Sequence, residues 1–375
     1  MKTLLTVIGA RPQIIKAAAI SRAISNHFSG QIKEKLLHTG QHYDANMSQI
    51  FFDELGIPQP DYNLGVGSGS HGQQTARMIS GIEEVLLSEH FDGMILYGDT
   101  NSTLAGAVAA SKLHIPIYHI EAGLRSYNMA MPEELNRIVC DQLSSICFAP
   151  TQTAIRNLQS EGLADPRATF ADGSHRRICL SGDVMYDNSL YFAQIAEQRS
   201  KILSELELQP NGYILATIHR PANTDDPERL NSILQALAAC SQRDNLPVVL
   251  PLHPRTRAIL EKNGNPILDT LAQQIKIIPP ASFLDITQLE QHARIIMTDS
   301  GGVQKEAFFF ERPCVILRSE TEWVEIVEQG AGIIADADYD RILNAYQHLV
   351  NKEVHFPALF GDAHAAEHIL NEILN

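Results

Sequence analysis

IIMTDSGGVQKE, residues 295–306, joins a short apolar run to two adjacent glycines and then to a helical spacing of apolar residues. This order predicts a strand, a tight turn and a helix. Two glycines let the backbone approach a ligand closely, and the first helical turn presents free N–H groups, which favour an anion such as phosphate. We therefore expect a sugar-nucleotide site, with the diphosphate on these amides and the ribose on Glu306. An ordinary strand-to-helix turn is the alternative.

The length and composition of the chain predict a globular protein with two domains. Its 375 residues exceed what one hydrophobic core usually serves, and 44% of them are hydrophobic while 19% are charged. The net charge of −15 argues against a nucleic-acid partner, because no basic excess exists to neutralise phosphates. A small anionic substrate stays compatible with this charge, since a few cations in a cleft outweigh distant acids.

The cysteines and the N-terminus predict a cytoplasmic protein. The cysteines are odd in number and lack metal-ligand spacing: Cys140, Cys147, Cys179, Cys240 and Cys314. Reduced thiols are the expected state. The apolar start of the chain is interrupted by Gly9 too early for a signal peptide, and no apolar run approaches the length of a membrane span.

Two cations follow the first predicted strand. Residues 4–8 form an apolar run without alternation, which is typical of a strand buried on both faces. A helix is expected to begin near Pro12, so Arg11 and Lys16 lie at the carboxyl end of the strand and in the start of the helix. Ligands bind at that edge of an open parallel sheet, and two cations there favour an anion.

Carboxylates gather at the same predicted edge. They follow two further strands or open a later helix: Asp99, Glu121 and Glu133. Arg125 and Arg137 are expected beside them. Carboxylates that share a cleft shift one another's pKa values, which suits acid–base chemistry. As an alternative for one member of the Glu133–Glu134 pair, the side chain only stabilises the positive end of its helix.

One glycine motif is rejected as a dinucleotide site. Residues 67–72 match G-x-G-x-x-G, but residues 61–64 make a poor strand before it, and Asp92 begins the next strand when it should end one. A flexible polar loop is the prediction for this stretch.

The second half of the chain repeats the alternation of strands and helices. A charged helical stretch over residues 187–207 is interpreted as the connector. Five further strands are predicted, each followed by polar or charged residues, at residues 213–218, 247–252, 275–278, 295–297 and 313–317.

The predicted architecture is α/β, with two Rossmann-like parallel-sheet domains that face each other across a cleft. We expect an N-terminal domain over residues 1–183, which carries the acid–base carboxylates, and a nucleotide-binding domain over residues 184–358. A C-terminal helix over residues 359–375 is expected to pack back across the junction.

Taken together, the motifs resemble those of the non-hydrolysing UDP-N-acetylglucosamine 2-epimerases. The matching pieces span nearly the whole chain, and six of them occur at compatible spacing: Gly9-Ala10-Arg11-Pro12 with Lys16, Gly98-Asp99-Thr100, Glu121-Ala122-Gly123-Leu124-Arg125, Pro132-Glu133-Glu134 with Asn136-Arg137, Thr217 with His219-Arg220, and Thr298-Asp299-Ser300-Gly301-Gly302-Val303-Gln304 with Glu306. The resemblance implies a glycosyltransferase-B-like fold, a UDP-sugar substrate, no metal, no bound cofactor and a homodimer.

The resemblance also implies a chemistry. The family eliminates UDP across C1–C2 of the sugar to leave a glycal, then adds UDP back with the proton on the other face. The acid–base carboxylates would be Asp99, Glu121 and Glu133, and His219 would steady the leaving UDP or relay a proton to it. The substrate-binding residues would be Arg11, Lys16, Arg137, His253, Ser300, Gly301, Gly302 and Glu306.

Three features of the sequence differ from the enzymes that act on UDP-N-acetylglucosamine itself and point to a subgroup of this family. The segment from Arg125 to Met131 is short, residues 41–44 replace a loop that contributes to an allosteric substrate site, and residues 321–325 read Thr-Glu-Trp-Val-Glu. These features resemble the enzymes that act on UDP-2,3-diacetamido-2,3-dideoxy-glucuronate, and they put allosteric activation in doubt. The expected reaction is gluco-to-manno inversion of this uronate for surface polysaccharide synthesis.

Three alternatives stay open at this point. The first is the conversion of UDP-N-acetylglucosamine to UDP-N-acetylmannosamine. The second, from a different class, is a retaining glycosyltransferase, which shares the fold and the diphosphate cradle but needs an acceptor. The third is a catalytically inactive nucleotide-sugar sensor.

Overall fold

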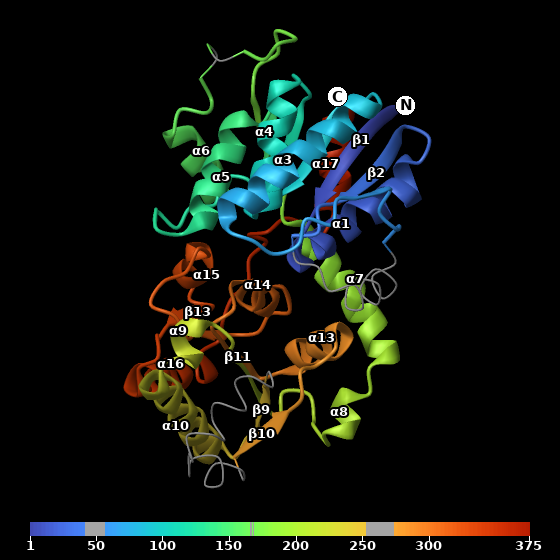
Figure 1. Ribbon diagram of the computed structural model, residues 1–375. Coiled ribbons are helices and arrows are strands. Elements are labelled where there is room, and N and C mark those ends of the chain that lie inside the picture. The colour runs from blue at the N-terminus through green and yellow to red at the C-terminus, as the bar shows by residue number, and fades with distance from the viewer. Residues whose placement is uncertain (42–56, 166, 168, 253–273) are drawn as a thin grey trace. The chain divides into compact units, whose positions relative to one another are not determined.

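The computed structural model describes residues 1–375 except 42–56, 166, 168 and 253–273, and the chain forms two compact units (Figure 1). Unit 1 consists of Met1–Asn188 and Ala358–Asn375, and unit 2 consists of Ser189–Pro357. His253, expected to bind substrate, lies outside the described residues, as do three residues of the 41–44 segment.

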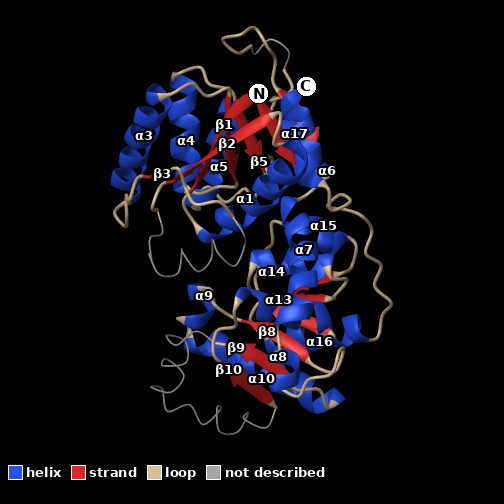
Figure 2. Ribbon diagram, turned by 90° about the vertical axis from the view of Figure 1, so that its right-hand side faces the viewer, coloured by secondary structure: helices blue, strands red, loops and turns tan. Residues whose placement is uncertain are grey.

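Unit 1 is built on a seven-stranded parallel sheet with the strand order β3-β2-β1-β4-β5-β6-β7. Its strands are β1 Lys2–Ile8, β2 Ile32–His38, β3 Tyr62–Asn63, β4 Gly93–Tyr97, β5 Ile117–Ile120, β6 Ile146–Ala149 and β7 Arg177–Leu180. Its helices are α1 Arg11–Ala23 with the π-helical continuation η1 Ile24–Phe28, α3 His71–Ser88, α4 Asn101–Lys112, α5 Pro132–Leu143, α6 Gln152–Ser160 and α17 Ala365–Leu374. Helices α3 and α4 cover one face of the sheet, and α17 lies on the other (Figure 2).

Small residues let α4 pack closely on this sheet. A Cβ atom on Gly106 would lie 2.6 Å from a methyl group of Leu96 and 3.2 Å from the sulfur of Met94. The alanines of α4 are buried in the same core as the apolar residues of β1 and β4. Close packing of helix and strand fixes where the N-terminal end of α4, just after Asp99, meets the sheet edge.

Unit 2 is built on a six-stranded parallel sheet with the order β10-β9-β8-β11-β12-β13. Its strands are β8 Ile214–Thr217, β9 Val248–Pro251, β10 Ile275–Ile278, β11 Ile295–Thr298, β12 Cys314–Ile316 and β13 Gly332–Ile334. Its helices are α8 Ile202–Glu205, α9 Pro221–Thr224, α10 Pro227–Asp244, α13 Phe283–His292, α14 Gly301–Phe309, α15 Val324–Glu328 and α16 Tyr339–Val350, while α7 Val184–Arg199 leads into the unit from unit 1.

The two sheets confirm the predicted fold class. In each sheet the strand order reverses beside the first strand: β1 lies between β2 and β4, and β8 lies between β9 and β11. Such a reversal opens a crevice at the carboxyl ends of the strands, which is where ligands bind in doubly wound folds.

Two local predictions were wrong. The connector is not one helix over residues 187–207, because it breaks into α7 and α8 at Ser200, whose hydroxyl donates to Asp285 (2.5 Å) and accepts from the N–H of Ile202. Tyr62 and Asn63 do pair with β2 as a short strand, and α3 begins at His71, inside the stretch that was predicted to be a loop. In both places a tertiary contact outweighs local sequence preference.

The C-terminal segment belongs to unit 1. Helix α17 packs against α1, and Lys2 donates its ammonium to the carbonyl of Ile373 (2.6 Å). Asp187 accepts the N–H groups of Ala365 and Ala366 (3.1 and 2.8 Å), which satisfies the first turn of α17. Within the described part of the chain, no helix combines the length and the apolar character needed to cross a membrane.

Asp187 yields a prediction about stability. Burial raises its pKa from the ordinary 3.8 to about 6, in spite of the N–H groups that it accepts. A folded acid that holds its proton more tightly than the unfolded chain contributes most stability at low pH, and the contribution is lost as pH rises from 3.8 to about 6. Asp187→Asn keeps an acceptor without the charge, so it should lack this loss, which is on the order of 3 kcal/mol.

Urea unfolding of both proteins across this pH range measures the difference. The exposed cap Asp338→Asn serves as the control, because Asn caps a helix as well as Asp does, and it should follow the wild type. An Asp187→Asn variant that is less stable than the wild type by a constant amount at every pH contradicts the assignment.

Candidate active site

An ion pair lies at the carboxyl edge of the unit 1 sheet. The Lys16 ammonium of α1 is 2.5 Å from the carboxylate of Glu121, which follows β5, and both side chains are about one-tenth exposed. Glu121 has a φ of +69°, a left-handed conformation that is unfavourable for a residue with a side chain. Gly98, with a φ of +59°, makes room for the pair, since a Cβ there would lie 3.3 Å from both charged atoms.

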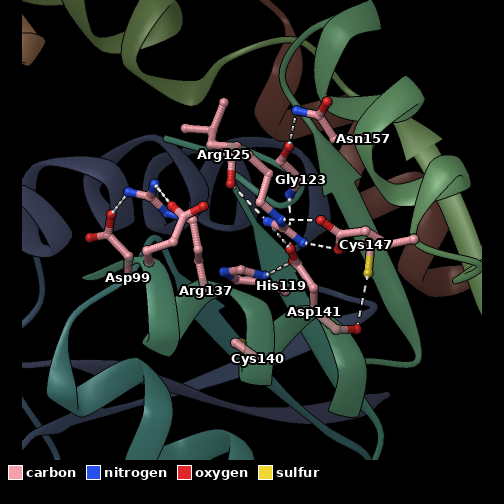
Figure 3. Close-up of polar contacts among 12 residues, drawn as sticks. Asp99, His119, Gly123, Arg125, Arg137, Cys140, Asp141, Cys147 and Asn157 are labelled. Atoms are coloured by element: carbon pink, nitrogen blue, oxygen red, sulfur yellow. Dashed lines mark hydrogen bonds and ion pairs between the residues drawn. The ribbon is translucent and has the colours of Figure 1, made fainter. Parts of the chain in front are cut away.

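A second pair holds Asp99 beside it. Arg137 of α5 contacts Asp99 with one nitrogen and Glu134 with another (2.7 Å to Glu134), as Figure 3 shows for Asp99. The Asp99 side chain is 29% exposed, whereas the Glu134 side chain is buried. Asn136 donates to the Asp99 carbonyl (2.9 Å) and fixes the backbone. Asp99 is therefore both paired with a cation and accessible.

Burial and hydrogen bonds have opposite effects on Glu134. Burial alone would raise its pKa, but the N–H groups of Ser126 and Tyr127 and the Arg137 guanidinium lower it. Glu134 therefore stays ionised and holds Arg137 in place. Its neighbour Glu133 is exposed in the first turn of α5, where its side chain reaches solvent.

Gln13 orders the turn that carries Arg11. Its side-chain oxygen accepts the N–H groups of Gly9 and Ala10 (2.9 and 3.2 Å), while its nitrogen donates to the carbonyl of Tyr97 (3.0 Å). Arg11 is exposed at the first position of α1. Gln13 was not expected at the site, although its position inside the Gly9–Lys16 motif indicates a place at this edge of the sheet.

Arg125 does not lie at this edge as expected. It is buried, and its guanidinium contacts Asp141 (2.8 Å) and Glu161 (2.6 Å) behind the turn that follows β5. Arg125 points into the unit because Gly123, with a φ of +81°, turns the chain before it.

The turn between β11 and α14 has the predicted form of strand, turn and helix. Ser300 caps α14 through its hydroxyl. Among the described residues, no group accepts a hydrogen bond from the N–H of Gly301 or Gly302. Glu306 is half-buried, with a carboxylate oxygen 4.0 Å from the place of a Cβ on Gly302. The turn thus presents amides and a carboxylate on one surface.

Asp299 positions the neighbouring loop that carries His219. The buried Asp299 carboxylate accepts the backbone N–H groups of His219 and Arg220 (both 3.1 Å) and lies 3.0 Å from Nδ1 of His219. Burial would raise the pKa of Asp299, but the contacts with His219 and Arg220 outweigh it and lower the pKa. The His219 side chain itself is 58% exposed.

Three further residues, which were not expected at the site, lie beside the α14 turn. A Cβ on Gly301 would lie 3.7 Å from the Arg318 guanidinium, 3.7 Å from the Glu322 carboxylate and 3.8 Å from the Trp323 ring nitrogen. Arg318 and Glu322 form a two-bond ion pair (2.9 and 3.0 Å). Their position directly after a predicted strand could have indicated that they lie at the ligand-binding edge of the sheet.

Similarity to solved structures identifies the class of protein. A crystal structure of the UDP-GlcNAc 2-epimerase from Methanocaldococcus jannaschii, with UDP-GlcNAc and UDP, has a TM-score of 0.83 and 39% identity, over 100% of this chain and 99% of that one. A UDP-bound transferase from Siraitia grosvenorii, at 12% identity and a TM-score of 0.62, shows the fold alone. The architecture is therefore glycosyltransferase-B-like.

The family follows from sequence similarity. The UDP-N-acetylglucosamine 2-epimerase family matches residues 25–374. The chain is 49% identical over 367 residues, 98% of both chains, to the UDP-2,3-diacetamido-2,3-dideoxy-D-glucuronate 2-epimerase of Pseudomonas aeruginosa. It is 44% identical to a UDP-N-acetylglucosamine 2-epimerase homolog of Methanococcus maripaludis over 99% of both. The chain belongs to the UDP-N-acetylglucosamine 2-epimerase family and is an isomerase.

The Asp299 cluster predicts the effect of a substitution. Asp299→Asn would replace one acceptor oxygen by an amide that faces N–H donors, so the His219 loop should lose both order and stability. We expect a loss of about 2–4 kcal/mol in the unfolding free energy of unit 2. Faster amide hydrogen exchange at residues 219–224, together with denaturant unfolding, measures it.

The exposed cap Asp226→Asn is the matched control. It also accepts two backbone N–H groups, but at the surface, so the change should be small. Equal effects of the two substitutions would show that Asp299 has no special role in the loop.

Proposed function

We propose that the protein inverts C2 of UDP-2,3-diacetamido-2,3-dideoxy-glucuronate, from the gluco to the manno form, by eliminating UDP and adding it back. The observation that carries the proposal is the pair of carboxylates at adjacent strand ends, Asp99 and Glu121, each beside a cation. Two carboxylates at one sheet edge suit proton transfer at a sugar carbon. The 49% identity to the Pseudomonas aeruginosa enzyme supports the choice of sugar.

The proposed reaction has two half-steps. In the first, a carboxylate takes the proton from C2, the C–H electrons form the C1=C2 double bond, and the C1–O bond breaks with its electrons left on the diphosphate of UDP. In the second, a diphosphate oxygen attacks C1 while a protonated carboxyl group delivers a proton to the opposite face of C2. Asp99, Glu121 and Glu133 are proposed as the acid–base groups.

Positive charge must surround the departing diphosphate. We propose Arg11, Lys16 and Arg137 in unit 1 and the amides of residues 300–302 in unit 2 for this role. His219, whose loop is ordered by Asp299, would steady the leaving UDP or pass it a proton. Glu306 would hold the ribose hydroxyls, and His253 is proposed to complete the substrate contacts.

A second candidate substrate is UDP-N-acetylglucosamine. The observation in its favour is the identity of 44% and 40% to a homolog and an enzyme of that type from Methanococcus maripaludis. We also propose that the protein acts in the cytoplasm as a homodimer and serves surface polysaccharide synthesis, including lipopolysaccharide. The five free thiols support the first of these points.

Incubation of each UDP-sugar separately in heavy water, without an acceptor, tests the reaction. The proposal predicts inversion at C2 with deuterium at that carbon, because the proton that returns comes from a group in exchange with solvent. We expect the uronate to react with a higher kcat/KM than UDP-N-acetylglucosamine. A faster reaction with the second sugar reverses the choice of substrate, and no deuterium with any UDP-amino sugar excludes the mechanism.

The carboxylates are tested by isosteric substitution. Asp99→Asn and Glu121→Gln should each lower kcat by about a thousandfold, since an amide cannot accept the proton. UDP affinity, measured by calorimetry, should change by only a few fold, because the phosphate-binding groups remain. If either variant loses UDP affinity or folds poorly, while its folded molecules keep the wild-type kcat, the acids have a structural role.

A further inference from the structure

A buried histidine lies behind the two proposed acid–base carboxylates. His119 of β5 has no exposed side-chain surface, and both of its ring nitrogens have partners, of which Figure 3 shows Asp141. Nδ1 is 2.7 Å from a carboxylate oxygen of Asp141 on α5, and Nε2 is 2.8 Å from the carbonyl oxygen of Gly98. The histidine therefore joins the end of β4 to helix α5.

The partners fix the charge of this histidine. A carbonyl oxygen only accepts, so Nε2 must carry a proton toward Gly98. Asp141 is ionised, because its other oxygen accepts from Arg125 (2.8 Å) and from the N–H of Gly123 (3.2 Å). An ionised carboxylate also only accepts, so Nδ1 carries a second proton. His119 is thus an imidazolium.

Neighbouring groups balance this charge. Arg125 makes two bonds of 2.6 Å to Glu161, so His119, Asp141, Arg125 and Glu161 form a chain with two cations and two anions. Burial lowers the pKa of His119, but contacts with Cys140 and Asp141 outweigh it and raise the pKa well above its usual value.

The remaining groups near this chain do not offer a competing charge. On β6, burial raises the pKa of the Cys147 thiol, which stays neutral. At the sheet edge, Lys16 is paired with Glu121, and Arg137 is paired with Asp99. The charge of His119 therefore depends on the neighbouring Cys140 and on Asp141, whose carboxylate contacts Nδ1.

The His119–Asp141 pair restrains both turns that carry the carboxylates. His119 holds the carbonyl of Gly98, one residue before Asp99, while Asp141 holds the N–H of Gly123, two residues after Glu121. Glu121 has a φ of +69°, which is unfavourable for a residue with a side chain, so its turn is not a conformation that the chain adopts without support.

We propose that His119 and Asp141 are positioning residues, whose ion pair sets the separation of Asp99 and Glu121 for proton transfer at C2. The inference rests on the proposed function. A neutral His119 has only one N–H, so it must release either Gly98 or Asp141. The turn that is released would move its carboxylate, and small displacements of catalytic groups cost large factors in rate.

Asp141→Asn tests the proposal through the pH dependence of kcat. Without the anion, burial should lower the pKa of His119, and the new amide can donate to the unprotonated Nδ1 while its oxygen accepts from Arg125 and Gly123. We therefore expect kcat near the wild-type value at about pH 8 and a fall of about tenfold to a hundredfold at acid pH, where a second ring proton would face the amide. KM should stay within about threefold of the wild type, because the UDP-binding groups are intact. The wild type should lack this titration.

Two further variants keep the test decisive. His119→Gln should lower kcat by a similar factor without the new titration, since no imidazole remains. Glu161→Gln, at the half-exposed outer end of the chain, should keep the wild-type pH profile because Asp141 still faces His119. A loss of kcat in Asp141→Asn that is uniform with pH, or an unchanged kcat in His119→Gln, overturns the proposal.

A measurement on the resting protein separates this inference from the proposed reaction. In ¹⁵N-histidine NMR spectra at about pH 8, the wild type should show an imidazolium signal that is absent from His119→Gln. In Asp141→Asn, the signal of His119 should be that of a neutral imidazole. A neutral His119 in the wild type contradicts the inference whatever the activity. An imidazolium signal together with an absence of C2 exchange would contradict only the proposed function.

Discussion

Parallel pairing of neighbouring strands is the constraint on which the chemistry of both units depends. Parallel strands must all end at the same edge, so residues far apart in the sequence meet wherever their strands pair. The register of β4 and β5, with Leu96 opposite His119 and Tyr97 opposite Ile120, brings the Asp99 turn beside the Glu121 turn. The register of β8 and β11, with Thr217 opposite Thr298, places the His219 loop against Asp299 in the same way.

Compensated charge is the second feature shared by the two units. Burying an ionised group is costly unless an opposite charge and hydrogen bonds replace its water. Several acids in these turns have such partners: Lys16 for Glu121, Arg137 for Asp99 and Glu134, and the backbone N–H groups of His219 and Arg220 for Asp299. For Glu134 and Asp299 these contacts outweigh the effect of burial and lower the pKa.

The sequence predicted the elements that carry strong local signals. Continuous apolar runs identified most of the strands, and polar residues at their ends identified Lys16, Asp99 and Glu121, which the structure places in adjoining ion pairs. The turn at residues 298–306 was recognisable because two glycines and a helical pattern follow one another directly.

The rest depends on contacts that local patterns do not encode. His119 looks like part of an apolar strand, and only the packing of α5 against β5 brings Asp141 to it, 22 residues later. Arg125 was expected at the sheet edge because Gly123 permits a left-handed turn but does not show which way the chain leaves it. The break between α7 and α8 likewise depends on Asp285, which is distant in the sequence.

The central claim is that the C1–O bond of the sugar nucleotide breaks and re-forms during inversion at C2. Positional isotope exchange measures this directly in a substrate with ¹⁸O in the bridge between C1 and the β-phosphorus. If UDP leaves and returns, rotation of its terminal phosphate moves the label into non-bridging positions of recovered substrate and product. Inversion at C2 with the label retained entirely in the bridge would contradict the account.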